Sequence, residues 1–257
     1  MTFGQQFTAF RTIVIKEILR FSRIWVQTIL PPAITTTLYF VIFGNLIGSQ
    51  IGDMDGFSYM EYIVPGLILM AIITNSYANV VSSFYGSKFQ KNVEELIVSP
   101  VSNSVILLGF VMGGVARGLA VGIVVTIISL FFSKLEIQHI GVTLFIIVIT
   151  AFLFSLGGFI NAVYAKSFDD ISIVPTFILT PLTYLGGIFY SIKMLPDFWQ
   201  TASLANPILY MVNAFRYGIL GVSDIDLWRA FFIIALFTIG LYLWALRLLQ
   251  TGTGIRN

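Results

Sequence analysis

Long apolar runs separated by short polar segments set the pattern of this chain. A helix needs about 20 mainly apolar residues to cross the hydrocarbon layer of a membrane, so each long run is a candidate for one crossing. The pattern predicts an all-α integral membrane protein with six transmembrane helices, at about 24–47, 62–85, 104–131, 140–165, 171–190 and 228–249. One transmembrane domain over 1–257 is the expected organisation.

Two further segments are amphipathic rather than uniformly apolar. Near the N-terminus, large apolar residues recur every three or four positions with charged residues between them, which predicts an interfacial helix at 3–23 on the membrane surface. The stretch 195–222 is too long for a simple loop and too apolar for water, and Asn206-Pro207 would break a seventh span in its middle. A re-entrant helical hairpin before the last span is the prediction there.

The composition fits a membrane protein and excludes several kinds of chemistry. Hydrophobic residues make up 57% of the chain and charged residues 10%, against about a quarter charged in soluble domains. The sequence has no cysteine and a single histidine, His139, so thiolate metal sites and paired-histidine sites are excluded. A formal net charge of +2 predicts no nucleic-acid partner.

Basic residues gather on one side of the predicted spans. The side that holds both termini has Arg11, Lys16, Arg20, Arg23, Lys88, Lys91, Lys166, Arg247 and Arg256. The opposite side has only Lys134, Lys193, Arg216 and Arg229. Because lysine and arginine favour cytoplasmic loops, both termini are predicted to lie in the cytoplasm.

A short charged segment separates the second and third spans. Its sequence, KNVEELIVSPVSNS, predicts a helix at 91–98 that ends at Ser99-Pro100. Mixed charged and apolar residues bounded by proline favour an element docked on a partner, and an ordinary solvated loop is the alternative. The predicted contact residues are Lys91, Glu94, Glu95 and Leu96. Asp169 and Asp170 of the next inner loop form either a second contact or a solvated turn.

Polar residues inside the spans are candidates for a transport path. They are Asn75, Tyr77 and Asn79 in the second span and Thr180 and Tyr184 in the fifth. Such side chains either bind the polar part of an amphipathic substrate or only hydrogen-bond to neighbouring helices. Arg117, deep in the third span, has either a structural role or a role in gating or substrate contact, and Arg216 has either a structural role or a role in gating. Glycines at four-residue steps around Arg117 predict close helix packing.

Two stretches resemble the signatures of a known family. EELIVSPVSNSVILLG, Glu94 to Gly109, and NPILYMVNAFRYGILG, Asn206 to Gly221, resemble ABC-2 type transporter permeases, and the likeness extends over nearly the whole chain. The resemblance implies a non-catalytic permease subunit of an ATP-binding cassette exporter in a bacterial inner membrane. It also implies that the helix at 91–98 is a coupling helix on the ATPase, and that the second and fifth spans border the path between two subunits.

Energy for transport has to come from another subunit. No G-x-x-x-x-G-K-[ST] phosphate loop occurs in the sequence, so ATP and Mg²⁺ are expected on a separate ATPase subunit, in two copies, with no cofactor in this chain. Six spans are half of the usual ABC membrane unit, so a homodimer is the simplest expectation, surrounded by membrane lipids. The expected substrate is amphipathic, lipid-linked or a drug, moved out of the cytoplasm or the inner leaflet.

Two other function classes stay open at this point. An integral membrane enzyme that modifies lipids would need a nucleophile, a base or a metal at the membrane face, and His139 stands alone while Asp53, Asp55 and Glu61 cluster in an outer loop. An ion-driven secondary transporter would need buried carboxylates, which the centres of spans two to six lack. The sequence gives both of these hypotheses less support than it gives the exporter hypothesis.

Overall fold

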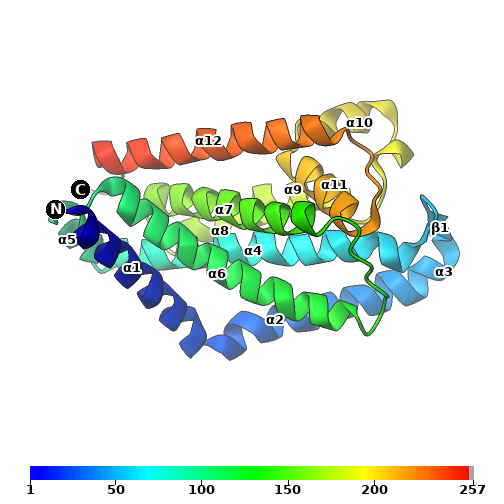
Figure 1. Ribbon diagram of the computed structural model, residues 1–257, viewed down its shortest axis with the longest axis horizontal. Helices are drawn as coiled ribbons and strands as arrows, with labels where there is room; N and C mark the ends of the chain where they lie inside the picture. Colours follow the sequence, from blue (N-terminus) through cyan, green and yellow to red (C-terminus); the bar gives the residue numbers. More distant parts are fainter. Residues whose placement is uncertain (255–257) are drawn as a thin grey trace.

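Long helices that run roughly along one direction dominate the computed structural model (Figure 1). The structure describes residues 1–254, except for the side chains of Asn45 and Ser49, so Arg256 lies outside the described residues. The long helices are α1 (Phe3–Arg23), α2 (Trp25–Tyr39), α4 (Tyr59–Phe89), α6 (Asn103–Ser129), α7 (Ile140–Tyr164) and α12 (Leu227–Thr251). In the described part of the chain, five helices are long and apolar enough to cross a membrane, beginning at Trp25, Tyr59, Asn103, Ile140 and Leu227.

The helix α4 forms the centre of the bundle. In its most apolar stretch 83% of the residues are buried, against 17% in the helix that begins at Trp25, so α4 is the core and α2 lies at the edge. Glycines let α6 approach it closely, because a Cβ atom at Gly118 would collide with Ser76, and one at Gly122 would lie 2.8 Å from Ile72. The predicted role of these glycines in packing is confirmed.

The first predicted span continues beyond α2 as a π-helix, η1 (Phe40–Ile47), and a last turn, α3 (Gly48–Ile51). A small antiparallel hairpin then joins β1 (Asp53–Met54) to β2 (Phe57–Ser58), with Asp55 and Gly56 both at positive φ. Asp-Gly is a typical turn for a two-residue hairpin, because both positions need a left-handed backbone. The fold is therefore almost, but not wholly, α-helical.

The predicted span at 171–190 is shorter and less regular than expected. It consists of α8 (Asp170–Val174), the π-helix η2 (Pro175–Leu179) and α9 (Thr180–Tyr184), which together reach about 22 Å, short of a hydrocarbon layer of about 30 Å. Pro175 lacks the N–H that would bond the carbonyl of Ile171, and Asn161 Nδ2 donates to that carbonyl instead, at 3.1 Å. Within residues 1–254, five helices rather than six therefore have the length to cross.

Short helices follow at the end of the bundle where α12 begins (Figure 1). They are η3 (Ile192–Met194), α10 (Asp197–Ser203) and α11 (Pro207–Leu220). The break predicted at Asn206-Pro207 separates α10 from α11, because Asn206 caps α11 by accepting a hydrogen bond from the Ile208 N–H at 3.0 Å and Pro207 takes the first helical position. α11 packs among α4, α7 and α12 and is almost entirely buried.

Candidate coupling surface and membrane pocket

The helix α5 (Asn92–Val98) lies at the end of the molecule that holds both termini (Figure 1). Lys91 precedes it with a left-handed backbone, φ 62°, and Ser99-Pro100 ends it. Val93 is buried, and Leu96 and Ile97 pack against the bundle, so these apolar side chains face inward. Glu94, Glu95 and Val98 face outward and line an open groove of about 490 Å³. The exposed face therefore combines two carboxylates with one apolar side chain.

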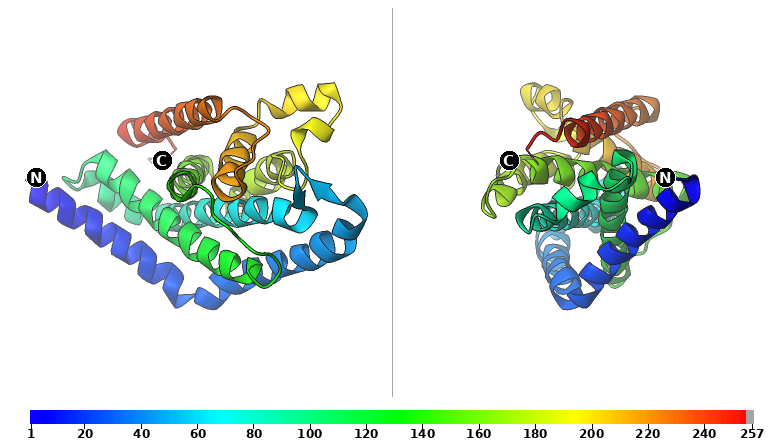
Figure 2. Two further views of the ribbon diagram at one scale, coloured as in Figure 1. Left: turned by 45° about the vertical axis from the view of Figure 1, so that its right-hand side comes forward. Right: turned by 90° about the vertical axis from the view of Figure 1, so that its left-hand side faces the viewer.

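The first turns of α1 hold the segment that follows α5. Gln6 Nε2 donates to the carbonyl of Pro100 at 3.1 Å, and Gln6 Oε1 accepts from the Ser102 N–H at 3.0 Å. Ser102 in turn caps α6, because its hydroxyl accepts from the Val105 N–H. α1, α5 and α6 are thus tied together at this end, and Figure 2 shows α1 running along the outside of α6.

The two predicted inner loops meet beside α5. Lys88 Nζ donates to the carbonyls of Val163 and Ala165, both at 2.7 Å, and the ring of Tyr85 packs edge-on against that of Phe168 at a centroid distance of 4.9 Å. A cavity of about 650 Å³ lies between the loops, with Lys91, Glu94 and Lys166 among the residues that line it. Contacts on either loop can therefore be transmitted to the other.

Asp169 and Asp170 differ in their surroundings. The Asp170 carboxylate accepts hydrogen bonds from the backbone N–H of Lys166 at 2.8 Å and of Ser167 at 3.0 Å, and the first of these bonds is the main reason that its pKa is lowered. The side chain of Asp169 is exposed. Asp170 thus organises its own turn, while Asp169 is available on the surface.

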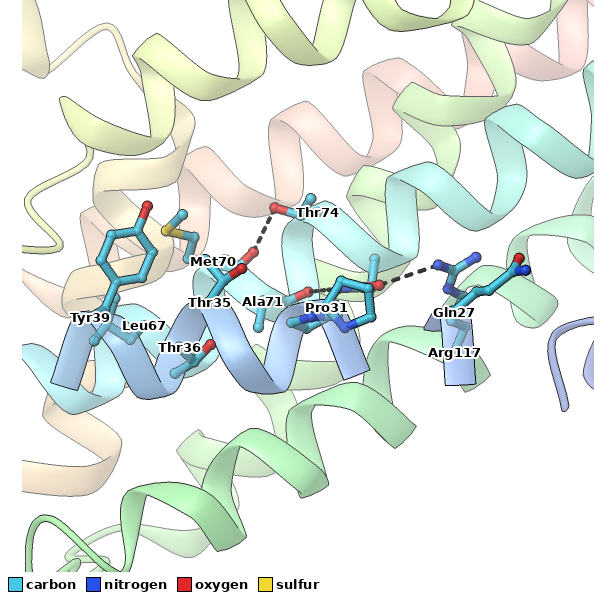
Figure 3. Close-up of a pocket in the computed structure, with 12 residues that line it drawn as sticks. Gln27, Pro31, Thr35, Thr36, Tyr39, Leu67, Met70, Ala71, Thr74 and Arg117 are labelled. Carbon is cyan, nitrogen blue, oxygen red and sulfur yellow. Dashed lines mark hydrogen bonds between the residues drawn. The ribbon is translucent and has the colours of Figure 1, made fainter. Parts of the chain in front are cut away.

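A pocket of about 310 Å³, here called the membrane pocket, lies between α2, α4 and α6 (Figure 3). Its walls are formed by Gln27, Pro31, Pro32, Thr35, Thr36, Tyr39, Leu67, Met70, Ala71, Thr74, Asn75 and Arg117. Arg117 Nη2 donates to Asn75 Oδ1 at 3.4 Å, and Asn75 Nδ2 donates to the Ala71 carbonyl at 2.9 Å. In Figure 3, Arg117 and Gln27 lie at one end of the pocket and Tyr39 at the other.

Next to this pocket, a buried polar cluster joins α1 to α4. Glu17 is completely buried, accepts from the Ser83 hydroxyl at 2.6 Å and pairs with Arg20 at 3.2 Å. Arg20 Nη2 also donates to the backbone carbonyl and the side-chain oxygen of Asn79, at 2.9 and 2.7 Å. A Cβ atom at Gly113 of α6 would collide with Glu17, so this glycine makes room for the cluster. α1 is therefore fixed to the bundle by buried polar contacts.

Comparison with known proteins assigns the family. Residues 8–220 match the ABC-2 type transporter family. The chain belongs to that family. It is also 59% identical, over 97% of its own length and 97% of the relative's, to the inner membrane transport permease YadH of Escherichia coli (strain K12). More distant relatives include nodulation protein J of Sinorhizobium fredii, 22% identical over 72% of this chain and 70% of that protein, and of Rhizobium meliloti, 20% identical over 80% of this chain and 79% of that protein.

The candidate path residues of this ABC-2 permease do not form one site. Asn75 lines the membrane pocket, and Tyr184 lies beside it through its hydroxyl, 3.0 Å from that of Tyr39. Asn79 instead binds Arg20, and Tyr77 is buried where α4 crosses Gly157 and Gly158 of α7. The Thr180 hydroxyl is exposed and donates to the carbonyl of Pro175 at 2.9 Å.

Sequence reasoning missed the contribution of α2 to the pocket. Gln27, Pro31, Thr35 and Tyr39 recur every four residues and all line it, so their spacing along one helix face was a usable signal. It also missed the cluster around Glu17, because the partner of Glu17, Ser83, lies 66 residues further along the chain. Leu96, one of the predicted contact residues, is partly buried and packs against the bundle.

Arg216 is buried within α11. Its Nη2 donates to the carbonyl of Gly187 at 2.6 Å, and its guanidinium lies 3.9 Å from the ring centroid of Tyr62. Nearby, the buried Asp224 carboxylate accepts from the Ser191 hydroxyl at 2.8 Å and pairs with Lys193 at 3.2 Å. These contacts join α11 to α4 and to the loop after α9.

Proposed function

We propose that the chain is the membrane-spanning permease subunit of an ATP-binding cassette exporter of bacterial inner membranes. Family membership supports a transport role, and a relative of 59% identity is named as an inner membrane transport permease. A separate ATPase, in two copies, would bind ATP and Mg²⁺ and supply the energy. The substrate would be an amphipathic or lipid-linked molecule or a drug, moved out of the cytoplasm or inner leaflet.

The main support for this proposal is that one face of α5 is buried and the other is exposed. Its inner face, with Val93 and Leu96, is packed on the bundle, while Glu94, Glu95 and Val98 are presented outward. Gln6 ties the end of α5 to the start of α6, so a movement imposed on α5 reaches a spanning helix directly. This is the arrangement that a coupling helix requires. Lys91 lies immediately before α5, and the exposed Asp169 would provide a second contact with the ATPase.

A second copy of the chain would complete the transport path. The segment α8–η2–α9 exposes Phe177 and a bent, proline-interrupted backbone at a depth where irregular structure survives only against protein or a cavity. The hydroxyl of Tyr184 in this segment contacts that of Tyr39 in α2. The segment and α2, both largely exposed in the single chain, are therefore neighbours. In the dimer, α8–η2–α9 serves as the sixth span, α10 and α11 as the re-entrant hairpin, and both termini lie in the cytoplasm.

The test is co-purification with an ATPase. The full permease is co-expressed with candidate ABC ATPase subunits from the same genome, as wild type, as Glu94→Arg/Glu95→Arg and as a matched control, Glu136→Arg. Glu136 is exposed in the loop between α6 and α7, at the opposite end of the bundle from α5 (Figure 1). Wild type and control should retain an ATPase and permease-dependent ATP hydrolysis, while the double variant loses both. Equal retention by all three would contradict docking through α5.

A further inference from the structure

We propose that the membrane pocket binds the anionic headgroup of an amphiphile, a phosphate or a carboxylate, and that Arg117 is its principal partner. This inference rests on the proposed export function where it names the occupant as a substrate. The reasons are the unmatched charge of Arg117, the engagement of the Glu17 carboxylate by other partners, and the presence of apolar side chains further along the pocket.

Arg117 has too few partners for a charge in this position. It lies about 21 Å along α6 from Asn103, near the middle of the predicted span. Among the residues the structure describes, it pairs with no carboxylate, and its Nε atom is buried without a hydrogen-bond partner. Its contact with Asn75, at 3.4 Å, is long for a hydrogen bond. A charge at this depth is costly unless a partner or water meets it, so the pocket presents donors that lack an acceptor.

The neighbouring charges increase the need for an anionic partner at Arg117. Arg20 is close enough to act on Arg117 by like-charge repulsion. The carboxylate in this region, Glu17, is already held by Ser83 and Arg20, further along the same face of α4. Glu17 therefore offsets the charge of Arg20 alone, and an added anion in the pocket would supply a partner for Arg117.

The walls of the pocket match an amphiphile rather than a bare ion. Gln27, Asn75 and Arg117 supply amide and guanidinium groups at one end, and a planar guanidinium suits two oxygens of a phosphate or carboxylate. Toward Tyr39, the lining includes Leu67 and Met70, which suit an alkyl chain (Figure 3). The headgroup would sit at Arg117 with its tail along α2 and α4.

The test measures the saturable binding of radiolabelled dodecyl phosphate to the full-length permease in phosphatidylcholine nanodiscs, above the level of empty discs. The variants are Arg117→Gln and Thr35→Trp, the second of which fills the pocket from an exposed position on α2 without altering Arg117. Arg229→Gln, which removes an exposed positive charge at the start of α12, is the matched control. Wild type and control should bind equally, and both pocket variants should bind at least about tenfold more weakly.

Several outcomes would overturn the proposal. They are the absence of saturable binding, equal binding by folded Arg117→Gln, and equal binding of an uncharged dodecyl ether of the same chain length. If Arg117→Gln does not fold, unchanged binding by Thr35→Trp has the same meaning. Displacement of dodecyl phosphate by an equal concentration of inorganic phosphate would overturn the amphiphile in favour of a simple anion.

A second arm distinguishes the source of the anion. In nanodiscs that contain phosphatidylglycerol, Arg117-dependent displacement of dodecyl phosphate by this lipid supports the pocket as a site for bilayer lipid. Unchanged binding in those discs supports the pocket as a site for the exported molecule. Because no ATPase or ATP is present, failure here leaves the coupling test of α5 unaffected, and failure of that test leaves this binding result standing.

Discussion

Glu17 shows at the scale of one residue how this permease places charge inside its bundle. Its carboxylate is fully buried, yet it has a hydroxyl partner in Ser83 and a cationic partner in Arg20. A buried charge is tolerated only when it is paired in this way. Because Arg20 also binds Asn79, the cluster fixes the end of α1 that leads into the first span.

Removing the Glu17 carboxylate should destabilise the permease. Glu17→Ala leaves the Ser83 hydroxyl and one face of Arg20 without an acceptor, which we expect to lower the free energy of unfolding by about 2 kcal/mol. Glu136→Ala, at an exposed glutamate, is the control and should have little effect. Thermal unfolding in detergent measures both variants. Equal midpoints would show that the cluster adds nothing to stability.

Asp170 predicts a pH dependence in the turn before α8. Backbone N–H donors, that of Lys166 first, hold the pKa of its carboxyl below the ordinary value. A lowered pKa in the folded state stabilises the turn above the pKa of the unfolded chain, and this stability is lost as pH falls through the lowered folded pKa. Asp170→Asn should therefore unfold at a lower temperature than wild type at neutral pH, with the difference shrinking below about pH 4.

The matched control for this pH profile is Asp169→Asn. Asp169 is exposed, and its side chain makes no hydrogen bond within the described chain, so its variant loses no such contact and should unfold close to the wild-type temperature. Thermal midpoints are compared for the three proteins from pH 7 to pH 3. A wild-type advantage over Asp170→Asn that stays constant, or grows on acidification, would contradict the assignment.

At the scale of helices, glycines determine how closely α6 approaches its neighbours. A Cβ atom at Gly114 would collide with Ser155 of α7 and would lie 2.9 Å from the backbone oxygen of Ser76 in α4. Gly114→Ala should therefore lower the free energy of unfolding by about 1–3 kcal/mol, as overpacking does. Gly240→Ala in α12 meets no atom within 4 Å and should be neutral or slightly stabilising, because alanine favours the helix. Similar thermal midpoints for the two variants would refute close packing at Gly114.

Helix positions were predictable from the sequence wherever the pattern was long and uniform. The boundaries of α1, α6, α7 and α12 follow from charge-poor runs and amphipathic spacing, which depend only on local sequence. The segment after Asp170 was harder, because composition does not show how Pro175 and Pro181 shorten a helix. The pairing of Glu17 with Ser83, and of Arg117 with Asn75, joins residues far apart in the chain. Such contacts depend on which helices are neighbours, which periodicity alone does not specify.

At the scale of the whole molecule, the surfaces left exposed differ in kind. α12 presents large apolar side chains such as Phe232, Ile239 and Leu243, as expected for a helix facing lipid. The segment α8–η2–α9 exposes Phe177 beside the Thr180 hydroxyl and a proline-interrupted backbone. A short, interrupted helix with an exposed threonine is less suited to lipid than α12 is, so this second surface is the one that a partner subunit should cover.

Cysteine cross-linking tests this assignment, because the sequence has no native cysteine to interfere. Phe177→Cys and Ile239→Cys each place one thiol on a strongly exposed position, 74% and 59% exposed in the single chain, so both thiols are accessible to the reagent. A two-fold axis brings the same surface of both copies together. Treatment of native membranes with a short bismaleimide should therefore yield a covalent dimer for Phe177→Cys and little for Ile239→Cys. If Ile239→Cys cross-links and Phe177→Cys does not, the subunits meet through α12, and the membrane pocket faces lipid instead of a path between two copies.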